Sequence, residues 1–201
     1  MNKYLLLIIL LSIGHGSNAQ SFEAMAGTKR IFIDAQYLEF IGAESKLSLF
    51  SRARATTEYD GQNTDLFTGA YLNYTTKVGF GGTIVGRISS NNSGVDVGIH
   101  YFKAKKSLLI YALPSIHIGD NLLYSWFSLL RFTPELKNDW KLYTSLELFS
   151  AFGAVGHLSS VQRIRLGIDK SGYQWGTAIN LNESRFSNTD ANMGLFFRKQ
   201  F

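Results

Sequence analysis

The chain has 201 residues, a formal net charge of +5 and no cysteine, and charged residues make up 17% of it. The lack of cysteine excludes disulfides and zinc–thiolate sites, and so mild a positive charge gives no argument for a nucleic-acid partner. The length suits a single domain, while the charged fraction is below the roughly 25% that is typical of soluble domains.

Residues 1–19 have the three-part pattern of a secretory signal peptide. Lys3 supplies a positive charge, residues 4–13 form an apolar run, and Ser17 and Ala19 are the small residues that precede a cleavage point. The run is too short for a transmembrane helix. We predict export and cleavage after Ala19, and because no cysteine follows that point, we expect no lipid anchor.

Residues 20–45 allow two interpretations. The stretch 31–40 alternates enough to form a strand, and it could equally form a short helix that plugs or caps one mouth of a barrel. We therefore treat 20–45 as an N-terminal segment that is a plug, a cap or an extra strand.

Residues 46–201 consist of stretches in which apolar and polar residues alternate, separated by turn residues such as Asp60-Gly61 and Ser171-Gly172. The predicted strands are 46–59, 65–76, 79–89, 94–104, 107–118, 122–133, 140–151, 157–169, 172–182 and 191–201. They have roughly 10–14 residues, whereas strands of soluble sheets most often have about 5–6 and a tilted membrane strand needs about 9–11. We predict an all-β, antiparallel up-and-down transmembrane β-barrel of ten strands.

Two alternatives remain open at this stage. Bacterial barrels have an even number of strands, so a strand at 31–40 would require twelve. A soluble sandwich or lipocalin-like barrel would also alternate, but it would turn its charged face to solvent and its apolar face inward.

The two faces of the predicted strands differ in charge. Ile164, Leu166 and Ile168 lie on one face of their strand, while Arg163 and Arg165 lie on the other. In a membrane barrel the uncharged face meets lipid, so the charged face lines the lumen. The residues expected to form a lumen charge network or anion site are Arg52, Arg54, Arg87, Arg131, Arg163, Arg165, Arg198, Glu58, Asp96, Glu147 and Asp169.

Aromatic residues on the apolar faces fall into rows. If both termini are periplasmic, the membrane girdle at that end consists of Tyr74, Phe80, Tyr101, Phe132, Trp140, Tyr173 and Phe201. Tyr59 and Tyr124 lie at the opposite end. Girdles at both interfaces are typical of transmembrane barrels, because amphipathic rings prefer the headgroup level.

The last nine residues, MGLFFRKQF (193–201), alternate up to a terminal aromatic. Met193, Leu195, Phe197 and Phe201 resemble the C-terminal β-signal of Gram-negative outer-membrane proteins, and Lys199 departs from it where an apolar residue is more usual. The resemblance implies an outer-membrane location, with outer-membrane lipid and the barrel-assembly machinery as partners. The sequence as a whole resembles those of small outer-membrane barrels from the Bacteroidota, and the resemblance extends to no characterised family.

The arginine-rich lumen has two interpretations. In a packed polar core, the buried charges would pair with one another. Alternatively, guanidinium groups in excess of the acids would bind anions or line a narrow anion-selective path.

A His-x-Ser pair offers a third interpretation. His157 and Ser159 resemble the pair that outer-membrane lipid acyl hydrolases use, in which an imidazole activates a hydroxyl toward an acyl carbon. Strict alternation places both residues on the lumen side, away from lipid. Asp96 and His100 would lie roughly 13 Å apart along one strand, too far to share a metal ion. We therefore predict no metal and no cofactor.

The outward connections are short, which disfavours receptor, adhesin and protease roles built on long loops. The leading hypothesis is a non-enzymatic barrel with a sealed lumen, acting structurally or as a subunit of an envelope complex with a protein partner. The alternatives are a narrow anion-selective channel and a lipid acyl hydrolase.

Overall fold

The computed structural model describes residues 19–42, 46–90, 93–119, 122–185 and 187–201, which form a closed antiparallel barrel of twelve strands. The strands are β1 (Ala19–Gly27), β2 (Arg30–Ile41), β3 (Leu47–Glu58), β4 (Thr64–Thr75), β5 (Phe80–Ser89), β6 (Ser93–Ala104), β7 (Leu108–Ile118), β8 (Tyr124–Phe132), β9 (Trp140–Gly153), β10 (Gly156–Lys170), β11 (Tyr173–Ser184) and β12 (Ser187–Gln200). The prediction of ten strands is therefore wrong, and the twelve-strand alternative describes the barrel. The signal peptide expected at 1–19 falls almost wholly outside the described residues.

The two additional strands come from residues 20–45, which belong to the barrel wall and are neither plug nor cap. β1 pairs with β2 and, on its other edge, with β12, where Ala24 lies opposite Phe197. The Phe201 amide donates a hydrogen bond of 2.9 Å to the Gln20 carbonyl. Both ends of the described chain therefore lie at one end of the barrel, which we call the termini end.

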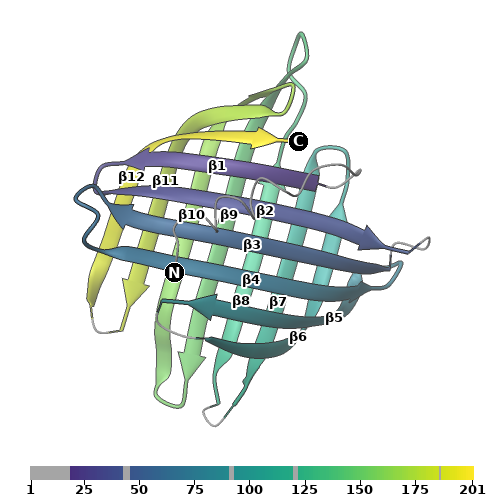
Figure 1. Cartoon of the computed structure of the whole chain (residues 1–201). Helices are drawn as coiled ribbons and strands as arrows, with labels where there is room; N and C mark the ends of the chain where they lie inside the picture. Colours follow the sequence, from purple (N-terminus) through teal and green to yellow (C-terminus); the bar gives the residue numbers. More distant parts are fainter. Residues whose placement is uncertain (1–18, 43–45, 91–92, 120–121, 186) are drawn as a thin grey trace, which may run out of the picture.

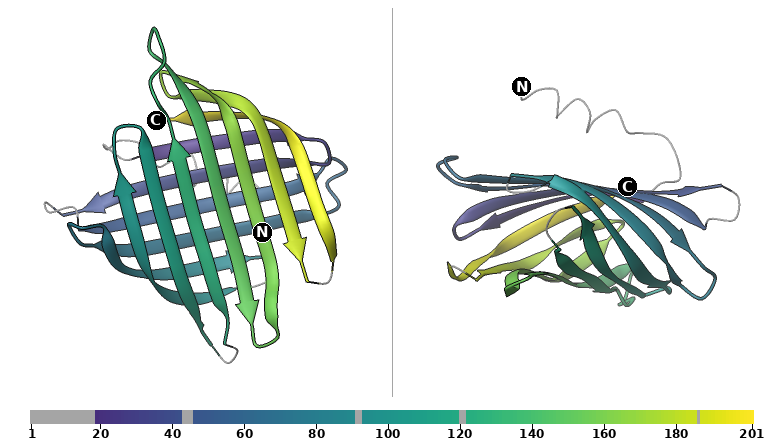
Figure 2. Two further views of the ribbon diagram at one scale, coloured as in Figure 1. Left: turned by 180° about the vertical axis from the view of Figure 1, so that it is seen from behind. Right: turned by 90° about the horizontal axis from the view of Figure 1, so that it is seen from below.

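The barrel is flattened into two layers (Figures 1 and 2). The layer that contains β1–β4 runs across the layer that contains β9–β12 (Figure 1). Barrel strands tilt by roughly 35–45° from the axis, so strands on opposite walls necessarily cross. Flattening brings the inward side chains of the two layers within contact distance, which a round barrel of twelve strands would not.

Burial in this barrel is inverted relative to a soluble protein. Large apolar side chains on the outer surface are exposed, among them Ile99 (68%) and Leu195 (67%), whereas many of the buried side chains are polar or charged, such as Arg52, Glu147 and Asn192. A barrel that faces hydrocarbon requires this arrangement, while a soluble sandwich requires the opposite. The structure therefore argues against the soluble alternative.

Some of the described connections between strands are tight hairpin turns. The turn between β10 and β11 consists of Ser171 and Gly172, both with positive φ (54° and 77°), as the tightest hairpin turns require. Asn138 and Asp139 also have positive φ, in the longer connection before β9. Compact turns leave the lumen as the main place where side chains converge. None of the described residues forms a helix long and apolar enough to cross a membrane, a finding that does not bear on crossing by strands.

Candidate functional site

An ion-pair network crosses the centre of the lumen. Arg52 of β3 donates from Nε to Oδ1 of Asp34 in β2 (2.6 Å) and from Nη1 to Oε2 of Glu147 in β9 (2.6 Å). β2 and β3 belong to one layer and β9 to the other (Figure 1). The Arg52 side chain is only 6% exposed, so these contacts join opposite walls away from solvent.

Glu147 is the acceptor on which three arginines converge. Besides Arg52, it accepts from Nη2 of Arg54 (3.0 Å) and from Nη1 of Arg163 (2.5 Å). The guanidinium groups of Arg54 and Arg163 also lie 5.7 and 5.4 Å from the centre of the Phe32 ring. Charge and an aromatic ring together fill the middle of the lumen.

A second network connects the first strand to the last ones. Glu23 of β1 accepts from Nε of Arg165 (2.8 Å) and lies 3.7 Å from Nη1 of Arg198. Arg165 also donates to Asn180 Oδ1 (2.9 Å), and Arg198 donates to Ser21 Oγ (2.7 Å). A void of only about 20 Å³ remains among the two networks.

The central region carries more positive than negative charge. Six arginines lie here (Arg52, Arg54, Arg131, Arg163, Arg165 and Arg198), against the three carboxylates Glu23, Asp34 and Glu147. Among the described side chains, none forms an ion pair with Arg131, whose guanidinium lies 5.8 Å from the Tyr143 ring and whose Nε has no hydrogen-bond partner. The central region therefore carries excess positive charge, and Arg131 takes no part in the ion pairs of its described side chains.

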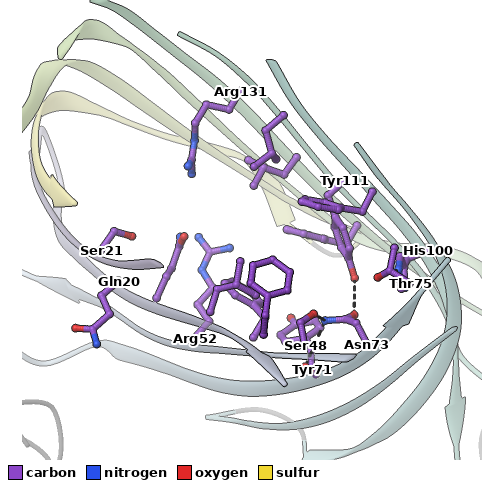
Figure 3. A pocket seen from close by; sticks show the side chains of 18 of the residues that line it. Gln20, Ser21, Ser48, Arg52, Tyr71, Asn73, Thr75, His100, Tyr111 and Arg131 are labelled. Carbon is purple, nitrogen blue, oxygen red and sulfur yellow. Dashed lines mark hydrogen bonds between the residues drawn. The ribbon is translucent and has the colours of Figure 1, made fainter. Parts of the chain in front are cut away.

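A cavity of about 680 Å³ lies between this network and the termini end (Figure 3). Arg52 and Arg131 reach into it from opposite walls, and Ser21 lies nearby. Gln20 and Gln200 line it at the termini end, so it opens there. Between the two arginines, which form its floor, and the opening at the termini end, the wall of the cavity carries aromatic and aliphatic side chains, namely Leu38, Phe50, Tyr71, Leu109, Tyr111, Phe127 and Leu129.

The other charged residues predicted for the lumen lie in separate groups. Arg87 donates to Asp96 (2.6 Å), which also contacts His117 Nδ1 (2.9 Å). Asp169 accepts from Gln174 (2.6 Å). Glu58 accepts from Asn63 (2.6 Å), outside the central network.

His100 contacts Thr75 Oγ1 (2.9 Å) through Nε2 and Thr83 Oγ1 (2.7 Å) through Nδ1, and it does not join Asp96. The described residues contain no cluster of three or more histidine, aspartate or glutamate side chains arranged to hold a metal ion.

Sequence reasoning missed Glu23 and Asp34, two of the three acids in the centre. Both lie in residues 20–45, for which the sequence allows two interpretations, and each is buried (5% and 2% exposed). The available signal was alternation: Ser21 and Glu23 alternate with Phe22 and Ala24, as in the other strands.

The predicted girdle residues lie at the termini end of their strands. Phe80 and Tyr101 are register partners with ring centres 4.9 Å apart, and Tyr74 is 51% exposed. Lys199, which departs from the β-signal pattern, places its ammonium 3.5 Å from the centre of the Tyr173 ring. A cation over an aromatic face is a favourable contact, so this lysine is compatible with a girdle position.

His157 pairs with Ser160 rather than with Ser159. A β-bulge lies between His157 and Ser159, and such an extra residue reverses the alternation. Ser159 stays on the lumen side with Arg163, while His157 moves to the outer face, against the exposed ring of Phe152 (5.5 Å). Its Nε2 lies 2.7 Å from Ser160 Oγ.

Family models and curated proteins give no match to this chain. Among solved structures, the KdgM porin in complex with disordered oligogalacturonate aligns with a TM-score of 0.53 at 10% identity, over 91% of this chain and 99% of that one. A second KdgM porin structure aligns with a TM-score of 0.51 at 10% identity and the same coverage. The fold is that of outer-membrane β-barrels. At this level of identity the likeness concerns the fold alone.

Proposed function

We propose that this chain is a non-enzymatic outer-membrane barrel whose lumen is closed, and that it acts structurally or as a subunit of an envelope complex. The observation that carries the proposal is the contact of Arg52 with both Asp34 and Glu147, which ties the two layers together across the lumen. Buried charges in such contacts are held firmly, because separating them leaves each one uncompensated.

The expected location follows from several features of the chain. An exported chain cleaved after Ala19 would begin at the first strand. An even number of strands places both termini on one side of the membrane, which is the periplasmic side in the expected orientation. The C-terminal strand, with Phe197 and Leu195 on its exposed face, would be the segment read by the barrel-assembly machinery. N-terminal sequencing of the protein from outer membranes tests both the cleavage point and the location.

Conductance tests the closed lumen. Wild-type protein in a planar lipid bilayer is expected to be silent, whereas the double variant Arg52→Ala/Glu147→Ala, which removes the central contact, is expected to conduct. Lys106→Ala/Glu135→Ala is the matched control, because it removes a lysine–glutamate pair whose side chains are 81% and 58% exposed. Steady conductance by the wild-type barrel would contradict the proposal.

The excess of arginine favours the anion-selective channel as an alternative. The KdgM porin, whose fold is similar, has been solved with an oligogalacturonate, an oligomer of a sugar acid. In this chain the void among the central arginines is only about 20 Å³, roughly the space of one water molecule, which argues against a continuous path. Anion-selective conductance that is lost in Arg87→Glu and Arg131→Glu variants would establish the channel instead.

Partnership is tested by the native mass of the protein after extraction from its own outer membrane in mild detergent. Co-purification of other chains at a defined mass supports the role as a complex subunit. A barrel that runs alone with its micelle contradicts a stable complex and leaves the structural role.

A second candidate function, acyl hydrolysis of a lipid, is favoured by the His157–Ser160 contact on the outer face. With Nδ1 carrying its proton, His157 Nε2 can accept the Ser160 proton while Ser160 Oγ attacks an ester carbonyl; the alcohol leaves with that proton, and water then releases the acid. Glu183 is the register partner of Ser160 and lies exposed on the neighbouring strand.

The hydrolase candidate has a matched control next to the dyad. His157→Ala and Ser160→Ala are each expected to lower acyl release from a lipid ester by about a thousandfold or more, whereas Ser159→Ala on the lumen side is expected to leave it unchanged. Absence of acyl release by the wild-type protein, or release that survives His157→Ala, would rule out this candidate.

A further inference from the structure

The cavity at the termini end is blind. Its floor contains Arg52, Arg131 and Arg198, and beyond them the two ion-pair networks fill the lumen. Its mouth is at the end where Gln20 and Gln200 lie. A cavity of about 680 Å³ falls within the range of small-molecule sites, roughly 300–1,000 Å³. A pocket that opens at one end and is closed at the other can hold a ligand but cannot pass it on.

The positive charge on the floor of the cavity is not fully paired with carboxylates. Arg131 projects into the cavity without a carboxylate partner among the described side chains, and its Nε has no hydrogen-bond partner (Figure 3). Arg198 also lies on the floor, and its Nε likewise has no hydrogen-bond partner. Because a buried guanidinium is stabilised by an anion that accepts from its fork of donors, the floor is complementary to a carboxylate.

The wall of the cavity is mostly apolar between its floor and its mouth, and polar or basic side chains, among them Lys46 and Lys77, lie nearer the mouth. Phe50 and Tyr71 lie with ring centres 5.3 Å apart, and Tyr111 and Phe127 with ring centres 5.9 Å apart.

The polar atoms between these rings are engaged with one another. Asn73 Oδ1 accepts from Tyr111 Oη (3.3 Å), and Asn73 Nδ2 donates to Ser48 Oγ (3.5 Å) (Figure 3). Asn73 Oδ1 also accepts from Thr83 Oγ1 (2.9 Å). Sugar hydroxyls would find these partners occupied, whereas an alkyl chain needs none.

We propose that this cavity binds a single-chain anionic amphiphile, with its carboxylate on Arg131 and its apolar chain along the wall of Leu129, Tyr111 and Phe127. The inference rests on the proposed function, because a blind site requires the closed lumen. It adds a ligand class and a side of entry: the ligand arrives from the termini end, which is periplasmic in the expected orientation.

Titration calorimetry on the full-length protein in lipid nanodiscs tests the site, with empty nanodiscs subtracted. Three ligands separate the contributions: decanoate carries charge and chain, decanol carries the chain alone, and galacturonate carries the charge alone. Decanoate is expected to bind saturably. Decanol is expected to bind about tenfold to a hundredfold more weakly, because it lacks the charge-assisted contact, and galacturonate more than about a hundredfold more weakly, because it lacks the apolar chain.

Two variants locate the site, and one serves as control. Arg131→Gln is expected to weaken decanoate binding about tenfold or more while leaving decanol unchanged. Leu129→Trp, which fills the cavity, is expected to weaken both. Lys137→Gln removes an exposed charge in the connection before β9 and is expected to change neither.

Several results would overturn the inference. They are no saturable binding of decanoate by the wild-type protein, equal affinity for decanol or galacturonate, or an unchanged affinity in Arg131→Gln. The wild-type comparison needs no variant, so it holds even if a substitution prevents folding. A barrel that neither conducts nor binds decanoate refutes this inference alone. A conducting barrel that binds decanoate refutes the closed lumen, and with it the closed end of the site, but keeps the ligand class.

Discussion

Glu147→Gln is the most direct perturbation of the central network. The substitution keeps the size of the side chain and removes one charge. The Glu147 side chain is 7% exposed and accepts hydrogen bonds from three arginines, at 2.5 to 3.0 Å. In the variant, Asp34 remains as a carboxylate for Arg52 and Arg54, whereas Arg163 loses its carboxylate, and the amide can accept from only some of the donors.

The magnitude follows from these contacts. Hydrogen bonds to charged groups contribute about 1.5–3 kcal/mol each, and removing one partner of a buried ion pair costs about 3–5 kcal/mol. One hydrogen bond to the amide oxygen offsets part of the loss, so we expect Glu147→Gln to lower the free energy of unfolding by about 3–5 kcal/mol. That is a large share of the roughly 5–15 kcal/mol that is typical of folded proteins.

Urea titration of the barrel in lipid vesicles, followed by tryptophan fluorescence, measures the effect. Glu135→Gln is the matched control, because it makes the same chemical change in an exposed pair, worth about 0–1 kcal/mol. If Glu147→Gln unfolds within about 1 kcal/mol of the wild type, the network does not hold the layers together and the reasoning fails.

Three further predictions concern the first strand, β1, the last strand, β12, and the turn that follows β1. A Cβ at Gly194 would overlap the backbone of β1, so Gly194→Ala is expected to cost about 1–3 kcal/mol in the same titration, while Gly86→Ala, with open space around it, costs far less; equal costs would refute the overlap. Asn192 accepts from the Lys29 and Arg30 amides and donates to the Arg30 carbonyl, so Asn192→Ala is expected to cost about 2–3 kcal/mol; a loss below about 0.5 kcal/mol would contradict its role in the β1–β2 turn. Lys199→Leu replaces a cation–π contact with the usual apolar residue, so the free energy of unfolding should change by less than about 1 kcal/mol. The gel band of the folded barrel, which shifts on heating, should keep its intensity, and loss of that band would show that the lysine is required for assembly.

Most strands could be read from the sequence because alternation directly reports which face meets lipid. β3 to β12 follow the predicted ranges closely, since arginine or polar residues on one face oppose aliphatic residues on the other. β2 was ambiguous because both of its faces carry apolar residues, Phe32 on the lumen side and Ile31 and Ile33 on the outer side. β1 is short and its outer face carries one large side chain, Phe22, beside the small Ala24 and Ala26, so its pattern is weak.

The sites were predictable to different degrees for the same reason. Alternation identified the lumen arginines, but the arginines that converge on Glu147 come from strands on both layers, and no local pattern shows that the layers meet. The bulge beside His157 was also beyond the sequence, because one inserted residue reverses which side chain faces lipid without changing the composition. For that reason the hydroxyl partner of His157 is Ser160 and not the neighbour that strict alternation suggested.

The pairing of the first and last strands determines when part of the charge network can form during assembly. Glu23 meets Arg165 across 142 residues of sequence, and Arg198 bonds Ser21 across 177, so neither contact exists until β1 has joined β12. A barrel inserted up to that step would hold two guanidinium groups without their carboxylate, a state that a low-dielectric surrounding strongly disfavours. Closure of the wall and pairing of those two guanidinium groups with Glu23 thus depend on the same step, the joining of β1 to the last strands.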